Sequence, residues 1–137
     1  MSFSISQIDG LSEDEIKTLK AQGLRTTERL LEAARTPRGR RLLAEKTSIA
    51  ERRLLDCANA CDYMRIKGMG RGYVVLLRAV GVSTVRELQY RNPANLAKAM
   101  ADANKKNGLV RVLPSENLVV RWVEHAKNLP LKITYKD

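Results

Sequence analysis

A glycine-rich segment near the middle of the chain has the residue types that hold phosphate groups. After Ile66, its residues are Lys67, Gly68, Met69, Gly70 and Arg71. Glycine permits positive φ and close backbone approach, and a helix that follows points unpaired N–H groups and a positive dipole end at whatever lies there. An anion suits that position, and two basic side chains with no acid favour it. We expect these residues, with Arg78 on the same helix face, to contact backbone phosphates without reading base sequence.

The start of the chain has a similar turn with the opposite charge. Gly10 is present, Ser12 replaces the second glycine, and four acids lie between positions 9 and 15. Ser12 and Glu15 have the spacing of a capping box, which satisfies the first amides of a helix internally. This hairpin is therefore predicted to be structural or to dock a basic partner protein. The alternative for both segments is a tight turn between packed helices.

A second cluster of cations follows Thr36-Pro37, where proline is typical of the first position of a helix. Its members are Arg38, Arg40 and Arg41. Because cations at a helix N-terminus attract anions, this cluster is the second candidate phosphate site. Arg52 and Arg53 lie off the apolar stripe of their helix, and we expect them to face solvent.

Cys57, Cys61 and His125 are the residues that raise the question of a metal. A structural zinc takes four Cys or His ligands, and the chain has only these three. We interpret both cysteines as buried core residues, and Trp122 as core rather than a base-stacking platform. No Ser/His/Asp or Cys/His set and no GxxxxGK[ST] loop stands out. The sequence therefore predicts a binding module, not an enzyme, with no metal, cofactor or small-molecule substrate.

An internal repeat positions the two hairpins. When the sequence is aligned with itself at a shift of 58, residues 8–31 fall on 66–89 with seven identities in 24 pairs. At a shift of 65, the apolar helical stripe that begins at Leu54 falls on the one that begins at Val119. The second copy has a longer middle. We predict two units, 1–65 and 66–137, packed as one compact all-α domain.

Capping residues set the expected helix boundaries. S/T-x-x-E boxes begin at Ser12, Ser48 and Thr84, and Asn92-Pro93 starts another helix. Helix stops are expected at Gly23, Gly81 and Gly108. The predicted helices are 12–22, 26–35, 37–46, 48–63, 70–80, 84–91, 93–106 and 115–128, with extended ends at 1–7 and 130–137.

The repeat also predicts how the chain closes. By symmetry, the helix at 115–128 should lie beside the first hairpin, which otherwise lacks a preceding helix. Trp122 and Val119 should then pack near Ile8, Ile16 and Leu19, and the chain should unfold as one cooperative domain.

Charge is concentrated in the second half of the chain. The 137 residues carry a net charge of +10, and residues 66–137 hold 13 basic and 5 acidic side chains. This distribution favours a polyanion-binding face, although basic charge can also serve solubility alone. There is no secretion signal and no apolar run of the ~20 residues that a membrane span needs, so we expect a cytoplasmic protein.

The residues from Ile66 to Gly81 resemble a helix-hairpin-helix motif: apolar, any residue, Gly, apolar, Gly, then a helix that ends at Gly. The whole chain, including the Trp122 helix, is similar to an uncharacterised bacterial domain-of-unknown-function family with two such units in tandem. Repair and recombination proteins use this motif to hold DNA backbones. Glycosylases with the motif need a catalytic Asp soon after the hairpin helix, whereas here the next is Asp102.

The resemblance and the charge together imply sequence-independent DNA binding, accessory to DNA repair or processing. Two alternatives stay open. One is a protein-interaction module that uses the acidic first hairpin, and the other is binding of structured RNA.

Overall fold

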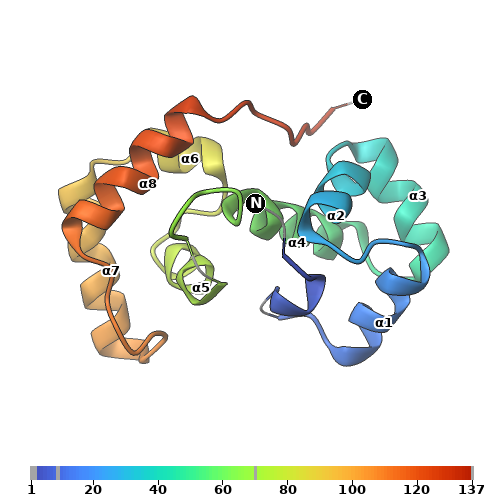
Figure 1. Cartoon of the computed structure of the whole chain (residues 1–137), viewed down its shortest axis with the longest axis horizontal. Coiled ribbons are helices and arrows are strands. Elements are labelled where there is room, and N and C mark those ends of the chain that lie inside the picture. The colour runs from blue at the N-terminus through green and yellow to red at the C-terminus, as the bar shows by residue number, and fades with distance from the viewer. Residues whose placement is uncertain (1–2, 9, 70, 137) are drawn as a thin grey trace. The chain divides into compact units, whose positions relative to one another are not determined.

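The computed structural model of the protein describes residues 3–8, 10–69 and 71–136. This described part is all-helical, as predicted, and each expected helix is present with its ends shifted by at most three residues (Figure 1). The α-helices are α1 (Glu13–Ala21), α2 (Thr27–Ala34), α3 (Pro37–Thr47), α4 (Glu51–Tyr63), α5 (Arg71–Ala79), α6 (Val85–Gln89), α7 (Pro93–Asn107) and α8 (Glu116–Asn128). None of them combines the length and the apolar character that a membrane span requires.

The chain divides into two compact units. The first comprises Met1–Arg65 and Lys132–Asp137, and the second comprises Ile66–Leu131. In the first unit α2, α3 and α4 pack on one another, and in the second α8 packs against α6 and α7 while α5 packs against α7. The last six residues thus join the first unit, whereas the sequence division placed them in the second. A single cooperative unfolding transition stays a prediction.

The first helix of each unit ends in the same way. Leu24 N–H donates to the Leu19 carbonyl across Gly23, and Val82 N–H donates to the Leu77 carbonyl across Gly81. These are Schellman closures, in which a residue with positive φ allows the backbone to turn back on the helix. Gly23 has φ +82° and Gly81 has φ +84°. The helix stops predicted at these glycines are confirmed.

The last helix of each unit supplies a buried apolar stripe. α4 and α8 both have 13 residues. The buried stripe residues are Leu54, Cys57, Ala58 and Cys61 in α4, and Val119, Trp122, Val123 and Ala126 in α8. Their i, i+3, i+4, i+7 spacing is the one that the shift of 65 aligned, so the interpretation of the cysteines and of Trp122 as core residues is confirmed.

α8 contacts the hairpin of its own unit, and its expected placement beside the first hairpin stays a prediction. Trp122 contacts the Tyr73 ring with centroids 5.1 Å apart, and Leu118 and Trp122 are the side chains nearest to Gly68. The last helix of the first unit likewise contacts its own hairpin, since Arg53 of α4 bonds the Gly10 carbonyl.

The N-terminal segment is not fully extended. Ile5–Gln7 form a 3-10 helix, η1, capped by Ser4, and Ile5 is completely buried. Ile5 N–H donates to the Arg25 carbonyl and Thr27 N–H donates to the Phe3 carbonyl. The segment therefore runs alongside the start of α2 and covers part of the first unit's core.

The C-terminal segment closes the first unit. Thr134 N–H donates to the Arg35 carbonyl at 2.7 Å, and Thr134 in turn accepts from Arg40 Nη2 at 2.8 Å. A longer ion pair joins Lys132 to Glu32 at 3.9 Å. Residues 132–136 thus pack in the first unit, where they contact the end of α2 and the start of α3.

Candidate functional site

The first hairpin is closed by its own residues. Ser12 Oγ accepts from Glu15 N–H at 3.1 Å, and Ser12 N–H donates to Glu15 Oε1 at 2.9 Å, which confirms the predicted capping box. Gly10 has φ +91°, a conformation that other residues rarely adopt. The Glu15 amide and the Glu15 carboxylate, both in the first turn of α1, are therefore already engaged. Asp9, which also adds negative charge here, lies outside the described residues.

Arg53 of α4 locks this hairpin from outside. Its Nε donates to Glu15 Oε2 at 2.6 Å, its Nη2 donates to Glu15 Oε1 at 2.7 Å, and the same Nη2 also bonds the Gly10 carbonyl. The guanidinium, helped by the Ser12 amide, lowers the pKa of Glu15 to about 2. We expected Arg53 only to face solvent, because its position off the apolar stripe gives no sign of a partner 38 residues away.

The second hairpin has an apolar support in place of this ion pair. Gly68 has φ +84°, and a Cβ built there would lie 3.2 Å from Leu118 Cδ1 and 3.6 Å from Trp122 Nε1. Trp122 is completely buried, and among the described residues its Nε1 has no hydrogen-bond partner. Gly68 is thus required both by its backbone conformation and by the close approach of α8.

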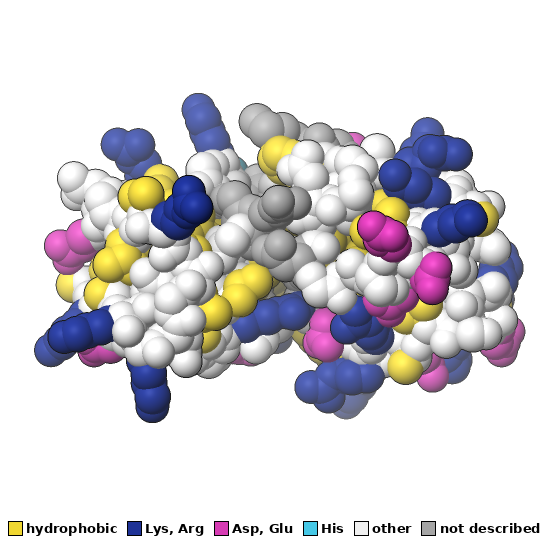
Figure 2. Space-filling view, turned by 90° about the horizontal axis from the view of Figure 1, so that it is seen from below, with side chains coloured by type: hydrophobic (Ala, Val, Ile, Leu, Met, Phe, Trp, Pro, Cys, Tyr) yellow, Lys and Arg dark blue, Asp and Glu magenta, His cyan; other side chains and the backbone are white. Residues whose placement is uncertain are grey.

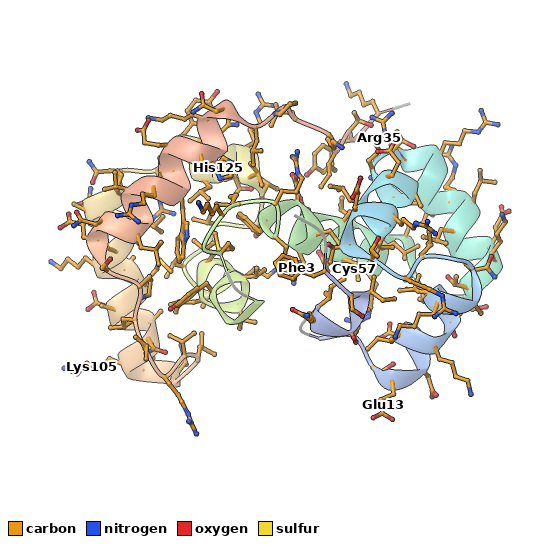
Figure 3. The ribbon with its side chains drawn as sticks, in the orientation of Figure 1. Phe3, Glu13, Arg35, Cys57, Lys105 and His125 are labelled. Carbon is orange, nitrogen blue, oxygen red and sulfur yellow. The ribbon has the colours of Figure 1, made fainter. Side chains whose placement is uncertain are left out.

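Two described amides of this hairpin are already satisfied. Lys67 N–H donates to His125 Nδ1 at 3.1 Å, and Met69 N–H donates to the Ile66 carbonyl at 3.1 Å. Figure 3 shows His125 on the side of α8 that faces the hairpin. His125 is a positioning residue that sequence reasoning missed, since it lies off the apolar stripe. The amides of Lys67 and Met69 are therefore not available to an anion at this turn.

The other residues expected at this site differ in exposure. Lys67 is exposed, whereas the Met69 side chain is 3% exposed and belongs to the core. Arg78 is exposed at the far end of α5, about 10 Å along the axis from Arg71 by the rise of an α-helix. Gly70 and the side chain of Arg71 lie outside the described residues.

The arginine cluster of α3 does not act as one surface. Thr36 caps α3 by accepting from Gly39 N–H at 3.0 Å, which confirms the helix start. Arg38 and Arg41 are exposed. Arg40 is 5% exposed and donates to the carbonyls of Ala34 and Thr134. Its guanidinium is thus held inside the first unit, which removes it from the exposed cluster.

The cysteines of α4 lie in the core. Cys57 and Cys61 are 5% and 1% exposed, and neither forms a disulfide within the described part of the chain (Figure 3 labels Cys57). Burial raises the pKa of the Cys61 thiol well above its usual range, so it is held as the neutral thiol. Within the described ranges, no three His, Cys, Asp or Glu side chains come together as metal ligands.

Charge separates the two units. The second unit holds eleven Lys and Arg against four Asp and Glu, a net charge of +7, while the first holds fourteen against eleven, a net charge of +3. In Figure 2, Lys and Arg side chains lie around exposed hydrophobic ones over the second unit (left half), with acids at its edge, whereas acids and bases mix over the first. The exposed hydrophobic residues of the second unit include Val112 and Leu113, in the segment between α7 and α8.

Comparisons with known proteins place the chain in a family. No curated protein and no solved structure gives a significant match. A family model described as a domain of unknown function, DUF4332, matches residues 9–129. This range includes both hairpins and α1 to α8, but neither η1 nor the C-terminal segment 132–136. Because the match covers most of its length, the chain belongs to the DUF4332 family.

Proposed function

We propose that the second unit binds DNA through the phosphate backbone without reading base sequence, as an accessory to DNA repair or processing. The observation that carries the proposal is the contrast between the two equivalent hairpins. The first is closed by Ser12, Glu15 and Arg53. The second presents an exposed Lys67 above an apolar support, on a unit with a net charge of +7.

Local geometry supports the helix-hairpin-helix reading of this site. Gly68 has positive φ at the turn, α5 follows, and α5 ends at the Schellman closure of Gly81. A turn of this kind brings the backbone of the protein close to a ligand, and phosphate contacts fix position without reading sequence. Any binding should therefore be similar for unrelated duplexes.

A salt titration tests the proposal. Fluorescence anisotropy is measured with two labelled duplexes of equal length and unrelated sequence, and with single-stranded DNA and structured RNA. We expect similar affinities for the two duplexes and a steep fall in affinity as salt rises, because phosphate contacts release counterions. Absence of binding at about 50 mM salt, where such contacts are strong, contradicts the proposal. Preference for structured RNA would favour that alternative.

Charge variants locate the surface. The double variant Lys67→Gln/Arg78→Gln should reduce the slope of log affinity against log salt by about two, since each lost phosphate contact removes about 0.9. The matched control is Lys17→Gln/Arg25→Gln, which removes the same charge from exposed positions of the first unit. An equal reduction in both variants would show that only net charge matters.

A protein-partner role for the first hairpin is the second candidate. Glu13 and Asp14 are exposed on the first turn of α1, and Figure 3 shows Glu13 pointing away from the helix. Glu15 is excluded from such a role because Arg53 occupies both of its oxygens. Two exposed carboxylates at a helix N-terminus would suit a basic partner surface.

A further inference from the structure

A cleft of about 300 Å³ opens beside the first turn of α5. It is lined by Gly72, Tyr73, Leu109, Val110, Arg111 and Val112. All of these residues belong to the second unit, and Gly72 and Tyr73 directly follow the second hairpin. The cleft thus lies next to the site proposed for the phosphate backbone.

The segment that forms one wall is peculiar to the second unit. Three residues, 48–50, connect α3 to α4, whereas 108–115 connect α7 to α8. The Asn104 side chain donates to the Val110 carbonyl at 3.0 Å and accepts from Val110 N–H at 2.8 Å. Tyr73 Oη donates to the Val112 carbonyl at 3.2 Å. The wall is therefore fixed by three hydrogen bonds to α5 and α7.

The lining has the chemistry of a site for a planar, uncharged ring beside an anion. Tyr73 gives an aromatic wall that is backed by Trp122, and Val110 and Val112 give apolar contacts. Arg111 is the charged member. Val112 is 72% exposed, so its side chain is open to a ligand in the cleft. Aromatic and apolar contacts of this kind stack bases of any sequence.

The charge around the cleft selects a polyanion over an apolar peptide. Between Asp102 and Glu116 the chain has three cations and no acid. The cations are Lys105, Lys106 and Arg111, all exposed, and Lys105 projects outward from the end of α7 in Figure 3. An apolar peptide ligand would gain nothing from these groups, whereas a nucleic-acid strand would use them for its phosphates.

We infer that this cleft receives one unpaired base of a nucleic-acid strand whose phosphates lie on the neighbouring cations. The inference rests on the proposed function and specifies its substrate class: DNA with a base outside the stack, such as a bulge, gap or single-stranded end. A base paired inside a regular duplex cannot enter the cleft, because its ring faces are covered by its neighbours. The second unit therefore discriminates distorted DNA from regular duplex.

A comparison of two bulged duplexes tests the inference. One carries a single unpaired base, and the other carries an abasic residue at the same place, so that only the base differs. We expect the wild-type protein to bind the first about tenfold more tightly, within the range that stacking on an aromatic side chain gives. Trp122 is the only tryptophan and lies beside Tyr73, so its emission should also change more with the base than without it.

Gly72→Ala is the decisive variant because its methyl group narrows the cleft between Gly72 and Val110 without harming the fold. The added Cβ would lie 3.7 Å from Val110 Cγ1, an ordinary contact, and alanine is favoured over glycine in a helix. In this variant the ratio of affinities for the base bulge and the abasic bulge should fall toward one. Its affinity for regular duplex should stay unchanged. Tyr90→Ala is the control, since Tyr90 is 79% exposed in the same unit but does not line the cleft.

The outcomes separate the two proposals. Equal wild-type affinity for base and abasic bulges overturns the cleft as a base site and leaves backbone binding intact. Persistence of the preference in Gly72→Ala overturns it as well. Failure to bind any nucleic acid at about 50 mM salt overturns the proposed function and the inference together.

Discussion

Arg53 and Leu118 occupy equivalent positions on α4 and α8, 65 residues apart, and they give the two hairpins opposite chemistry. Arg53 bonds the Gly10 carbonyl and both oxygens of Glu15. Leu118 packs where a side chain at Gly68 would lie. At this position the first hairpin thus has an ion pair with α4, and the second has an apolar contact with α8.

Glu15 makes the first unit sensitive to acid. Its pKa in the folded protein is about 2, below the ordinary 4.5, so its ion pair stabilises the fold fully above about pH 4.5 and is lost as pH falls toward 2. Urea unfolding of wild type and Glu15→Gln, measured across this range, should give a stability difference that is largest at neutral pH and vanishes near pH 2. A difference that does not change with pH would contradict this assignment.

The buried carboxylate of Asp62 changes the pH dependence of stability in the opposite direction to Glu15. Its contribution must be separated from that of Glu15. Burial raises its pKa, although Arg65 Nε donates to it at 2.8 Å. A raised pKa in the folded state makes protonation favour the fold as pH falls. Since both proteins retain Asp62, the difference between wild type and Glu15→Gln isolates the contribution of Glu15.

Helix positions were largely predictable from the sequence because capping is local chemistry. Asn92 Oδ1 accepts from Asn95 N–H at 3.0 Å, and Thr84 Oγ1 accepts from Glu87 N–H at 3.0 Å, as their spacing predicted. The contacts of Arg53 and His125 were not predictable, because both join residues far apart in the chain and neither lies on an apolar stripe.

Ser48 shows where a local signal fails. Its S-x-x-E spacing predicted an N-cap, but Ser48 is the C-cap of α3, with φ +63°, and its N–H donates to the Ala44 carbonyl at 2.8 Å. α4 begins instead after Ala50, which makes no side-chain cap bond. Only three residues separate the two helices. Because Ser48 serves as the C-cap of α3, it cannot also serve as the N-cap of α4.

Ser48→Gly should therefore stabilise the protein. A residue other than glycine in the left-handed region costs about 1–2 kcal/mol, and Ser48 is exposed, so glycine loses no packing there. We expect a gain of about 1 kcal/mol in the free energy of unfolding, read from the urea midpoint at constant slope. Ser48→Ala is the control, since alanine keeps the strain. A loss of stability in Ser48→Gly would show that the serine caps α4.

The two units differ in how their cores are completed. The second is continuous in sequence, whereas the first needs residues 132–136, which follow the whole of the second. Arg40 contacts this segment, because its Nη2 donates to the Thr134 carbonyl. The repeat of 58 and 65 residues predicted the helices of each unit, but it has no equivalent for this closing segment.

Removal of residues 132–137 should weaken the first unit selectively. A buried donor that loses its acceptor costs about 1–3 kcal/mol, and more when it is charged. Amide hydrogen exchange should show faster exchange in α2 and α3 of the 1–131 fragment, with α6 and α8 unchanged. Equal loss of protection in both units would instead support a single cooperative domain, and no loss would mean that Thr134 contributes nothing.

The closing segment also sets an order of events during translation. The 66 residues of the second unit are synthesised between Arg65 and Lys132, which takes on the order of 3 to 13 seconds at 5–20 residues per second. Throughout this interval the guanidinium of Arg40 has its Ala34 acceptor but not the one at Thr134. The first unit therefore acquires its final hydrogen bonds only after the whole second unit has been synthesised.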